Sequence, residues 1–169
     1  RTPMNAVVGM TNLLLTTEID PEQEKYVKGI QAASEHLLVL INDILDFSKI
    51  EAGKLQLDMV DFNLQELLEN VLETFKFKVK EKNLTLKLVM MEDTHALPPI
   101  LVGDPTRITQ IVINLVSNAI KFTNEGSIEV KVGLFAEDIK NATLSITVSD
   151  TGIGIPEEKL EHIFHSFEQ

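Results

Sequence analysis

The segment DPTRITQIVINLVSNAIKFT, residues 104–123, has the clearest helical pattern in the chain and decides how its second half folds. Asp104 can cap the N-terminus of a helix, and Pro105 suits the first helical position, where a missing N–H costs nothing. The pattern therefore predicts a helix that runs to Phe122. Its apolar residues recur at helical spacing and form one predicted face: Ile108, Ile111, Val112, Leu115, Val116 and Ala119.

The opposite side of this predicted helix carries a polar stripe. At 3.6 residues per turn its members lie within roughly 80° of one another: Arg107, Gln110, Asn114, Asn118 and Lys121. Amide oxygens are hard ligands of the kind that Mg²⁺ prefers, and a lysine is a point charge for phosphate. The alternative for Lys121 is a solvated surface charge, so the stripe needs a second signal before it indicates a nucleotide site.

The second signal is the sequence DTGIGIP, residues 150–156. It follows an alternating strand pattern and precedes a polar helical stretch. Gly152 and Gly154 permit positive φ or a close approach of the backbone to a ligand. The carboxylate of Asp150 accepts hydrogen bonds and can bind an exocyclic amine such as the amino group of adenine. Alone, this pattern could equally be a glycine-rich turn between a strand and a helix.

Together the two motifs resemble a known nucleotide site. NLVSNAIKFT and DTGIG resemble the N box and the first glycine box of the histidine-kinase ATP-binding domain, whose superfamily includes gyrase-type and chaperone ATPases. The start, RTPMN at residues 1–5, resembles the continuation of the kinase phosphoacceptor motif H-E-[IL]-R-T-P-[LM]-N. The end, FHSFEQ at residues 164–169, resembles the F box. The resemblance covers essentially the whole chain.

This resemblance implies the catalytic core of a sensor histidine kinase, with ATP and Mg²⁺ as cofactors. The enzyme would phosphorylate itself on a histidine three residues before Arg1 and pass the phosphoryl group to an aspartate of a response regulator. The flexible lid and the second glycine box would follow Gln169, so this segment alone is expected to be inactive. The R-T-P-M-N form and the long second helix are similar to kinases of the hybrid type, which carry their own receiver.

The resemblance also assigns roles to individual residues. Asn118 is the expected Mg²⁺ ligand. Hydrolytic relatives have a glutamate in place of Asn114; an amide cannot take a proton, which favours transfer to a ready nucleophile over attack by water. Thr2 lies four residues after the expected phosphoacceptor and could position water for a phosphatase reaction. The complete set of expected nucleotide-binding residues is Asn114, Asn118, Lys121, Asp150, Gly152 and Gly154.

Two other functions remain open at this point. One is a superfamily ATPase that uses nucleotide as a conformational clamp; Asn114 and the R-T-P-M-N start argue against it. The other is a degenerate kinase that acts as a dimerisation and nucleotide-sensing module, against which the intact boxes argue.

Residues 1–53 are predicted to form a dimerisation and phosphoacceptor hairpin. One helix covers 4–16, a second begins at Asp20-Pro21, and Gly53 is suited to end it. The second helix carries a heptad seam: Tyr26, Ile30, Ala33, Leu37, Leu40, Ile44 and Phe47. A homodimer that forms a four-helix bundle would bury this seam. The alternative is that the hairpin packs on its own downstream domain.

Residues 54–169 are predicted to form the ATP-binding domain. Strands are expected at 55–60, 84–91, 127–134 and 142–149, and a loop at 92–103. A helix is expected from Asn63, which makes a capping-box pattern with Glu66, to about Lys82. The expected fold class is α+β: a helical hairpin followed by an α/β sandwich whose mixed sheet is covered by helices on one face.

Composition narrows the alternatives. The 169 residues fit one or two small domains, and a hydrophobic content of 44% supports a core. A net charge of −11 argues against nucleic acid or an anionic membrane as a partner. The lack of cysteine is compatible with the cytoplasm, and any membrane span is expected upstream. None of the four histidines lies in the phosphoacceptor motif: His36, His95, His162 and His165.

Overall fold

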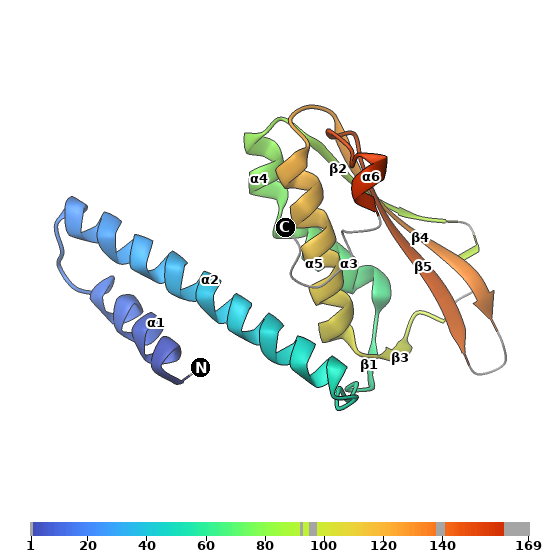
Figure 1. The fold of residues 1–169 in the computed structure, drawn as a ribbon. Coiled ribbons are helices and arrows are strands. Elements are labelled where there is room, and N and C mark those ends of the chain that lie inside the picture. The colour runs from blue at the N-terminus through green and yellow to red at the C-terminus, as the bar shows by residue number, and fades with distance from the viewer. Residues whose placement is uncertain (1, 92, 95–97, 138–140, 161–169) are drawn as a thin grey trace. The chain divides into compact units, whose positions relative to one another are not determined.

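The computed structural model describes residues 2–91, 93–94, 98–137 and 141–160, and the chain divides into two compact units, Arg1–Gln56 and Leu57–Gln169. Figure 1 shows the helices and strands of each unit. None of the helices within these described ranges is long and apolar enough to cross a bilayer.

The first unit is the predicted helical hairpin, formed by α1 (Thr2–Leu14) and α2 (Pro21–Glu51). Asp20 caps α2 as expected: its carboxylate accepts the N–H groups of Glu22 and Gln23, each at 2.9 Å. The Gln23 side chain in turn accepts the N–H of Asp20 at 3.1 Å, which completes a capping box. Beyond Glu51, Gly53 has a φ of +62°, so the predicted stop is also confirmed.

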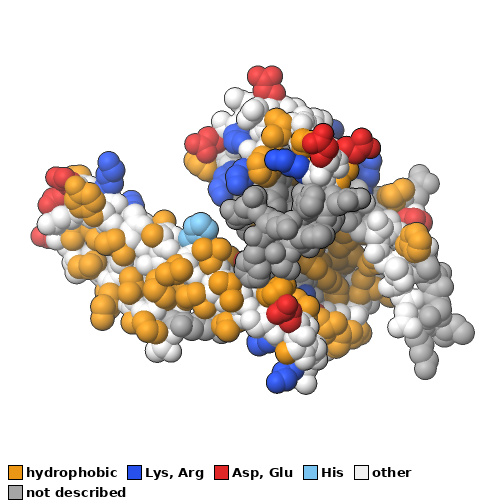
Figure 2. Space-filling model, viewed as in Figure 1, with side chains coloured by type: hydrophobic (Ala, Val, Ile, Leu, Met, Phe, Trp, Pro, Cys, Tyr) orange, Lys and Arg blue, Asp and Glu red, His pale blue; other side chains and the backbone are white. Residues whose placement is uncertain are grey.

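The second helix of the hairpin presents two different faces. One face contains the buried Val27 and Ser34, and between them the Gln31 amide donates to Asn12 of α1 at 2.8 Å. The adjacent face carries the apolar seam. Phe47 at its end is half-buried, and the other large residues of the seam are 44–59% exposed: Tyr26, Ile30, Leu37, Leu40 and Ile44. Figure 2 shows hydrophobic side chains gathered along this hairpin. Within the hairpin, therefore, α1 does not cover the seam.

The second unit is built on a three-stranded mixed sheet, as expected. Its strands are β2 (Thr85–Met90), β4 (Ser127–Glu137) and β5 (Ala142–Asp150), in the order β2-β4-β5. The β2–β4 pair is parallel and the β4–β5 pair antiparallel. Three helices lie on one face: α3 (Leu64–Glu73), α4 (Lys76–Glu81) and α5 (Pro105–Phe122) (Figure 1). The core between them includes the fully buried Leu68, Val112, Val116, Ile128, Val130 and Val132.

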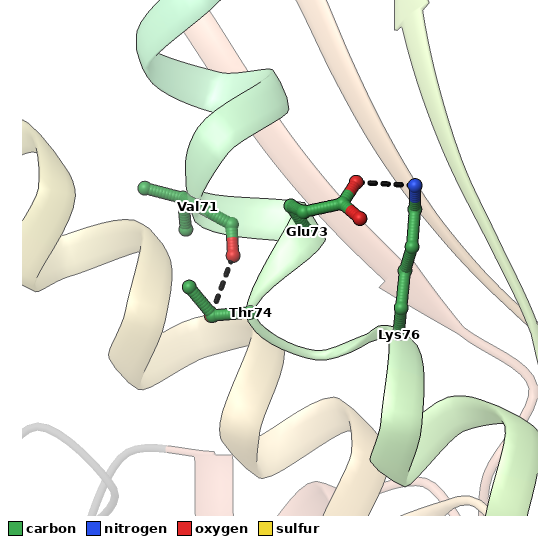
Figure 3. A network of polar contacts seen from close by, with 4 residues as sticks. All are labelled: Val71, Glu73, Thr74 and Lys76. Carbon is green, nitrogen blue, oxygen red and sulfur yellow. Dashed lines mark hydrogen bonds and ion pairs between the residues drawn. The ribbon is translucent and has the colours of Figure 1, made fainter.

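The predicted helix from 63 to 82 is wrong in one respect, because it is two helices. Asn63 does cap the first, since its side chain accepts the N–H of Glu66 at 3.1 Å. The helix then ends at Glu73, and Thr74 is its cap. The Thr74 hydroxyl donates to the carbonyl of Val71 at 2.7 Å (Figure 3), and the Thr74 N–H donates to the same carbonyl at 3.2 Å. An ion pair between Glu73 and Lys76 spans the break. Bonds to the third preceding residue tighten the last turn and end the α-helix.

The predicted strand at 55–60 is also wrong. Only β1 (Val60–Phe62) forms, and it pairs antiparallel with β3 (Leu101–Gly103), which lies in the segment predicted as loop. Leu57 and Met59 are both more than half exposed, so their alternation with polar residues does not reflect burial. This small sheet leads directly into α5, the helix that carries the polar stripe.

Asp104 caps the start of α5 and also accepts a hydrogen bond from the segment that precedes β1. One carboxylate oxygen accepts the N–H of Arg107 at 3.0 Å, the capping bond that the sequence predicts. The other accepts the N–H of Asp58 at 3.0 Å, across 46 residues of sequence. The hydrogen bond from Asp58, and next the bond from Arg107, hold the pKa of the Asp104 carboxyl below its usual value.

Candidate functional site

The helix α5 presents its predicted polar stripe on its exposed side. Asn114, Asn118 and Lys121 are all exposed, and neither asparagine side chain makes a hydrogen bond within the described part of the chain. Arg107 and Gln110, nearer the start of the helix, bond to each other at 2.8 Å. The two asparagine amides are therefore available to a ligand.

Apolar residues lie beside these amides. The predicted apolar face of α5 is only partly buried: Val112, Val116 and Ala119 face the core, whereas Ile111 is 59% and Leu115 41% exposed. Phe122 is also exposed. Ile120 is buried, although the sequence pattern did not predict this. Helical geometry places Ile111, Leu115 and Phe122 within roughly 60° of Asn118. The polar stripe thus has an apolar border, which suits a ligand with both a polar and an apolar part.

The predicted glycine turn follows β5 and is tied to the loop after α5. The hydroxyl of Thr151 accepts the N–H of Ser127 at 3.0 Å and donates to the carbonyl of Glu125 at 3.2 Å. Between those two residues, Gly126 has a φ of +111°, and a Cβ there would lie 2.2 Å from the Thr151 hydroxyl. The loop can approach Thr151 this closely because residue 126 is a glycine.

The turn also lies directly against the C-terminal end of α5. The N–H of Ile153 donates to the carbonyl of Phe122 at 3.3 Å. The Asp150 carboxylate accepts the N–H of Gly152 at 2.8 Å and the hydroxyl of Thr123 at 3.5 Å. A Cβ at Gly152 would lie 2.5 Å from the Phe122 carbonyl oxygen, so the turn needs a glycine there. The two sequence motifs therefore meet at one end of one helix.

Most of the predicted nucleotide-binding residues are brought together by this junction. Asn118 and Lys121 lie in the last turns of α5, next to the turn with Asp150 and Gly152. Asn114 lies one helical turn further away. Gly154 has a φ of +69° but no atom within 4 Å of the position of a Cβ, so its role is conformational in this structure.

The remaining predicted residues lie elsewhere. Thr2 is exposed at the start of α1, in the other unit, and His36 is exposed on α2. His95, His162, His165 and the F-box segment lie outside the described residues. Among the described residues there is no group of three or more His, Cys, Asp or Glu side chains that could hold a metal.

Two residues of the site were missed by sequence reasoning. Thr123 is fully buried and bonds to Asp150, and Thr151 links the turn to the loop at 125–127. Both threonines belong to the quoted motifs, so the signal was present. What was lacking was the knowledge that residues 26 and 27 positions apart along the chain are neighbours.

Comparisons with known proteins identify the family of this chain. Residues 1–53 match the His Kinase A (phospho-acceptor) domain, and residues 103–169 match the family described as histidine kinase-, DNA gyrase B-, and HSP90-like ATPase. The solved catalytic domain of the histidine kinase ThkA is 34% identical, with a TM-score of 0.51; the match covers 66% of this chain and 70% of that one. This chain belongs to the histidine kinases.

Other histidine kinases match the chain along its full length. The sensor protein GacS of Pseudomonas syringae is 46% identical over all 169 residues, which make up 18% of its own length. The full-length structure of ShkA, solved with AMPPNP, matches with a TM-score of 0.78 and 32% identity. The match covers the whole of this chain and 35% of the ShkA chain. A complex of ThkA with the response regulator TrrA matches at a TM-score of 0.56 and 29% identity, over 99% of this chain and 47% of that one. The chain therefore spans about a fifth or less of the length of the curated relatives that it matches, 18% of GacS and 8% of hybrid signal transduction histidine kinase B of Dictyostelium discoideum.

Proposed function

We propose that this histidine kinase core binds ATP at the junction of α5 and the glycine turn, and that the whole protein transfers the γ-phosphoryl group to a histidine. From there the group would pass to an aspartate of a response regulator. The observation that carries the proposal is the contact between the two motifs, from Ile153 to Phe122 and from Thr123 to Asp150. It brings an acceptor for the adenine amino group close to the helix that carries two amides and a lysine. The ligand named for ShkA, AMPPNP, is an ATP analogue and fits the same assignment.

The roles within the site follow from the chemistry of each group. Asp150 would accept from the adenine amino group, because an ionised carboxylate only accepts hydrogen bonds. Gly152 and Gly154 would allow the turn to approach the nucleotide. Lys121 would contact a phosphate as a point charge; its ammonium now lies 5.1 Å from the centre of the Phe122 ring.

A magnesium ion fits the donors that α5 offers. The Asn118 amide is exposed and has no hydrogen-bond partner among the described residues, and its oxygen is a hard ligand. Mg²⁺ commonly takes one or two protein ligands together with phosphate oxygens and waters, so a single amide from the chain is sufficient. When bound, the ion would neutralise charge on the phosphates. The Asn114 amide is one turn away.

The identity of residue 114 supports transfer over hydrolysis. In transfer, the lone pair of a neutral imidazole nitrogen forms the new P–N bond while the bond from the γ-phosphorus to the ADP oxygen breaks. The proton on the other imidazole nitrogen passes to solvent. This nucleophile needs no general base, and the amide of Asn114 cannot serve as one. Positioning and charge neutralisation would supply most of the rate.

The hairpin would contribute the dimer interface and the phosphoacceptor. We assign residues 1–53 to this hairpin and 54–169 to the ATP-binding domain. The two faces of α2 support the assignment, since one contacts α1 and the adjacent one is an uncovered apolar seam. A helix of a four-helix bundle contacts two neighbours in this way. A parallel homodimer would bury both seams.

Partners and location follow from the same reading. The ThkA–TrrA complex shows that a protein similar to this chain binds a response regulator, and we propose a receiver domain as the partner here, separate or in the same polypeptide. Thr2 would position water for a phosphatase reaction.

The core would work in the cytoplasm, where ATP is available. The nucleotide clamp and the degenerate kinase are not favoured by the matched families and relatives.

The test is to incubate the full-length protein with ATP labelled at the γ-phosphate and to examine the stability of the labelled product. A phosphohistidine is labile in acid and stable in alkali. We expect this behaviour. We also expect the labelled peptide to contain RTPMN, residues 1–5, with the label on the histidine three residues before Arg1. An acid-stable product, or a label on His36, would show that the assignment is wrong.

A further inference from the structure

The residue just after α4 holds the end of the helix that carries the polar stripe. The ammonium of Lys82 donates to the carbonyl of Ile120 at 2.7 Å and to the carbonyls of Lys121 and Thr123, each at 3.3 Å. It therefore contacts three of the last peptide groups of α5 and its cap. The bond to Ile120 spans 38 residues of sequence.

Among the carbonyls of residues 120–123, the one that Lys82 does not contact accepts a hydrogen bond from the glycine turn. Phe122 accepts the N–H of Ile153 at 3.3 Å. The last carbonyls of a helix have no partner within the helix and must be satisfied from outside. Here residues 120–123 are satisfied by two segments that are far apart in sequence, Lys82 and the turn at 150–153. The two segments thus hold the same helix end.

We propose that Lys82 is a positioning residue of the nucleotide site, an inference that rests on the function proposed above. By fixing the last turn of α5, it sets the direction of the Phe122 carbonyl and of the Thr123 hydroxyl. Those two groups hold Ile153 and Asp150. The Lys82 ammonium bonds only backbone carbonyls of α5 and its cap, and none of the side chains that are expected to contact the nucleotide. Lys82 would therefore act through the backbone of α5.

The charge of Lys82 has a second effect on the site. The C-terminal end of a helix carries a partial negative charge, which disfavours an anion nearby. Asn118 and Lys121, the expected partners of the phosphates, lie in the last turns of α5. An ammonium bound to the terminal carbonyls offsets this partial charge. Lys82 therefore both orients the helix end and makes its potential more favourable for a nucleotide.

A neighbouring lysine supplies a matched control. Lys78 of α4 lines the same surface pocket as Lys82, together with Ile120 and Lys121, but its side chain makes no hydrogen bond or ion pair within the described residues. Lys78→Met removes the same charge from the same region without removing a bond to α5. Lys82→Met removes both, and Lys82→Arg keeps the charge and the donors.

The experiment measures the dissociation constants of ATP and GTP for the full-length protein and these three variants, with hydrogen exchange of the amides of Gly152 and Ile153. We expect Lys82→Met to bind ATP roughly tenfold more weakly. Its preference for ATP over GTP should fall and the two amides should exchange faster. Lys78→Met should resemble the unmodified protein, and Lys82→Arg should recover most of the affinity. A loss of thermal stability alone would leave the ATP-to-GTP ratio unchanged.

Several results would overturn the inference. The first is an unchanged ATP affinity in Lys82→Met. The second is a loss of ATP affinity in Lys78→Met as large as that in Lys82→Met. The third is a loss of ATP affinity in Lys82→Met with an unchanged ratio of the ATP and GTP dissociation constants. If Lys82→Met does not fold, Lys82→Gln keeps a hydrogen-bond donor without the charge and is judged by the same ratio and exchange rates. Failure of the unmodified protein to bind ATP would instead count against the proposed function itself.

Discussion

The N–H of Ile153 donates to the carbonyl of Phe122 at 3.3 Å, which joins the glycine turn to the last residue of α5. Through this bond a strand end and a helix end, separated by a whole β-hairpin in the sequence, form one surface. The expected adenine acceptor and the expected phosphate contacts lie on the two sides of the bond.

Replacing Asn118 by alanine removes the expected magnesium ligand. The affinity for Mg-ATP should fall roughly 10- to 100-fold, the effect of losing one bond to a charged group. Isothermal titration of the full-length protein with ATP, with Mg²⁺ and with EDTA, measures this. With EDTA the variant and the unmodified protein should bind ATP about equally. The control is Ser117→Ala, an exposed position next in sequence on the same helix. An equal loss with and without Mg²⁺ would assign Asn118 a different role.

Replacing Asp150 by asparagine tests the recognition of adenine. Asparagine keeps an oxygen that can accept the N–H of Gly152, so the turn should hold its shape. Its NH₂ group, however, adds a donor opposite the donor of adenine. We expect the preference for ATP over GTP to fall, as it should in Asp150→Ala. Competition titrations with both nucleotides give the ratio. Equal affinity for ATP and GTP in the unmodified protein would show that Asp150 does not read the base.

Replacing Gly152 by alanine should displace the turn from α5. The new methyl group would lie 2.5 Å from the Phe122 carbonyl oxygen, which belongs to the backbone and cannot move alone. We expect a loss of about 1–3 kcal/mol in the free energy of unfolding and weaker ATP binding. Gly29→Ala is the control, because the site within α2 has open space. It should raise stability by about 0.5–1 kcal/mol and leave ATP binding unchanged. Normal ATP affinity in Gly152→Ala would argue against the close contact.

Two lysines in the seam of α2 should separate the dimer. Leu37→Lys with Ile44→Lys would place two charges per chain in the expected bundle core, each at a cost of several kcal/mol unless it reaches solvent. Sedimentation should then show monomers, with ATP binding by the second unit retained. Glu35→Lys adds a lysine on the opposite side of α2 and should leave the dimer intact. A monomeric unmodified protein at tens of micromolar would contradict the bundle.

The carboxylate of Asp104 makes stability depend on pH. Its pKa is lowered in the folded state by the N–H groups of Asp58 and Arg107, so the folded state binds its proton less readily than the unfolded state does. The stabilisation is therefore present above the ordinary aspartate pKa and is lost as the pH falls through the folded pKa. Urea unfolding across the acidic range should show this for the unmodified protein. Asp104→Asn, which still caps a helix, should show a weaker pH dependence. An identical pH profile for both would refute the assignment.

Much of the fold could be predicted from short stretches of sequence. Asp20, Asn63 and Asp104 each mark a helix start, because a cap satisfies N–H groups two or three residues away. The strands at 84–91, 127–134 and 142–149 follow from alternation, and the structure changes only their ends. The residues proposed for the nucleotide site could also be selected from the sequence, because their side-chain chemistry and spacing are local properties; their roles stay a prediction.

Other features were decided by the tertiary structure. The exposure of Ile111 and Leu115 depends on which side of α5 meets the sheet, and the pairing of β1 with β3 joins segments about 40 residues apart. The end of α5 is the clearest case, since its last carbonyls are satisfied by Lys82 and by Ile153. A helix start can be capped by the residue beside it. A helix end leaves carbonyls that here are satisfied by distant segments, and only the folded chain brings those segments together.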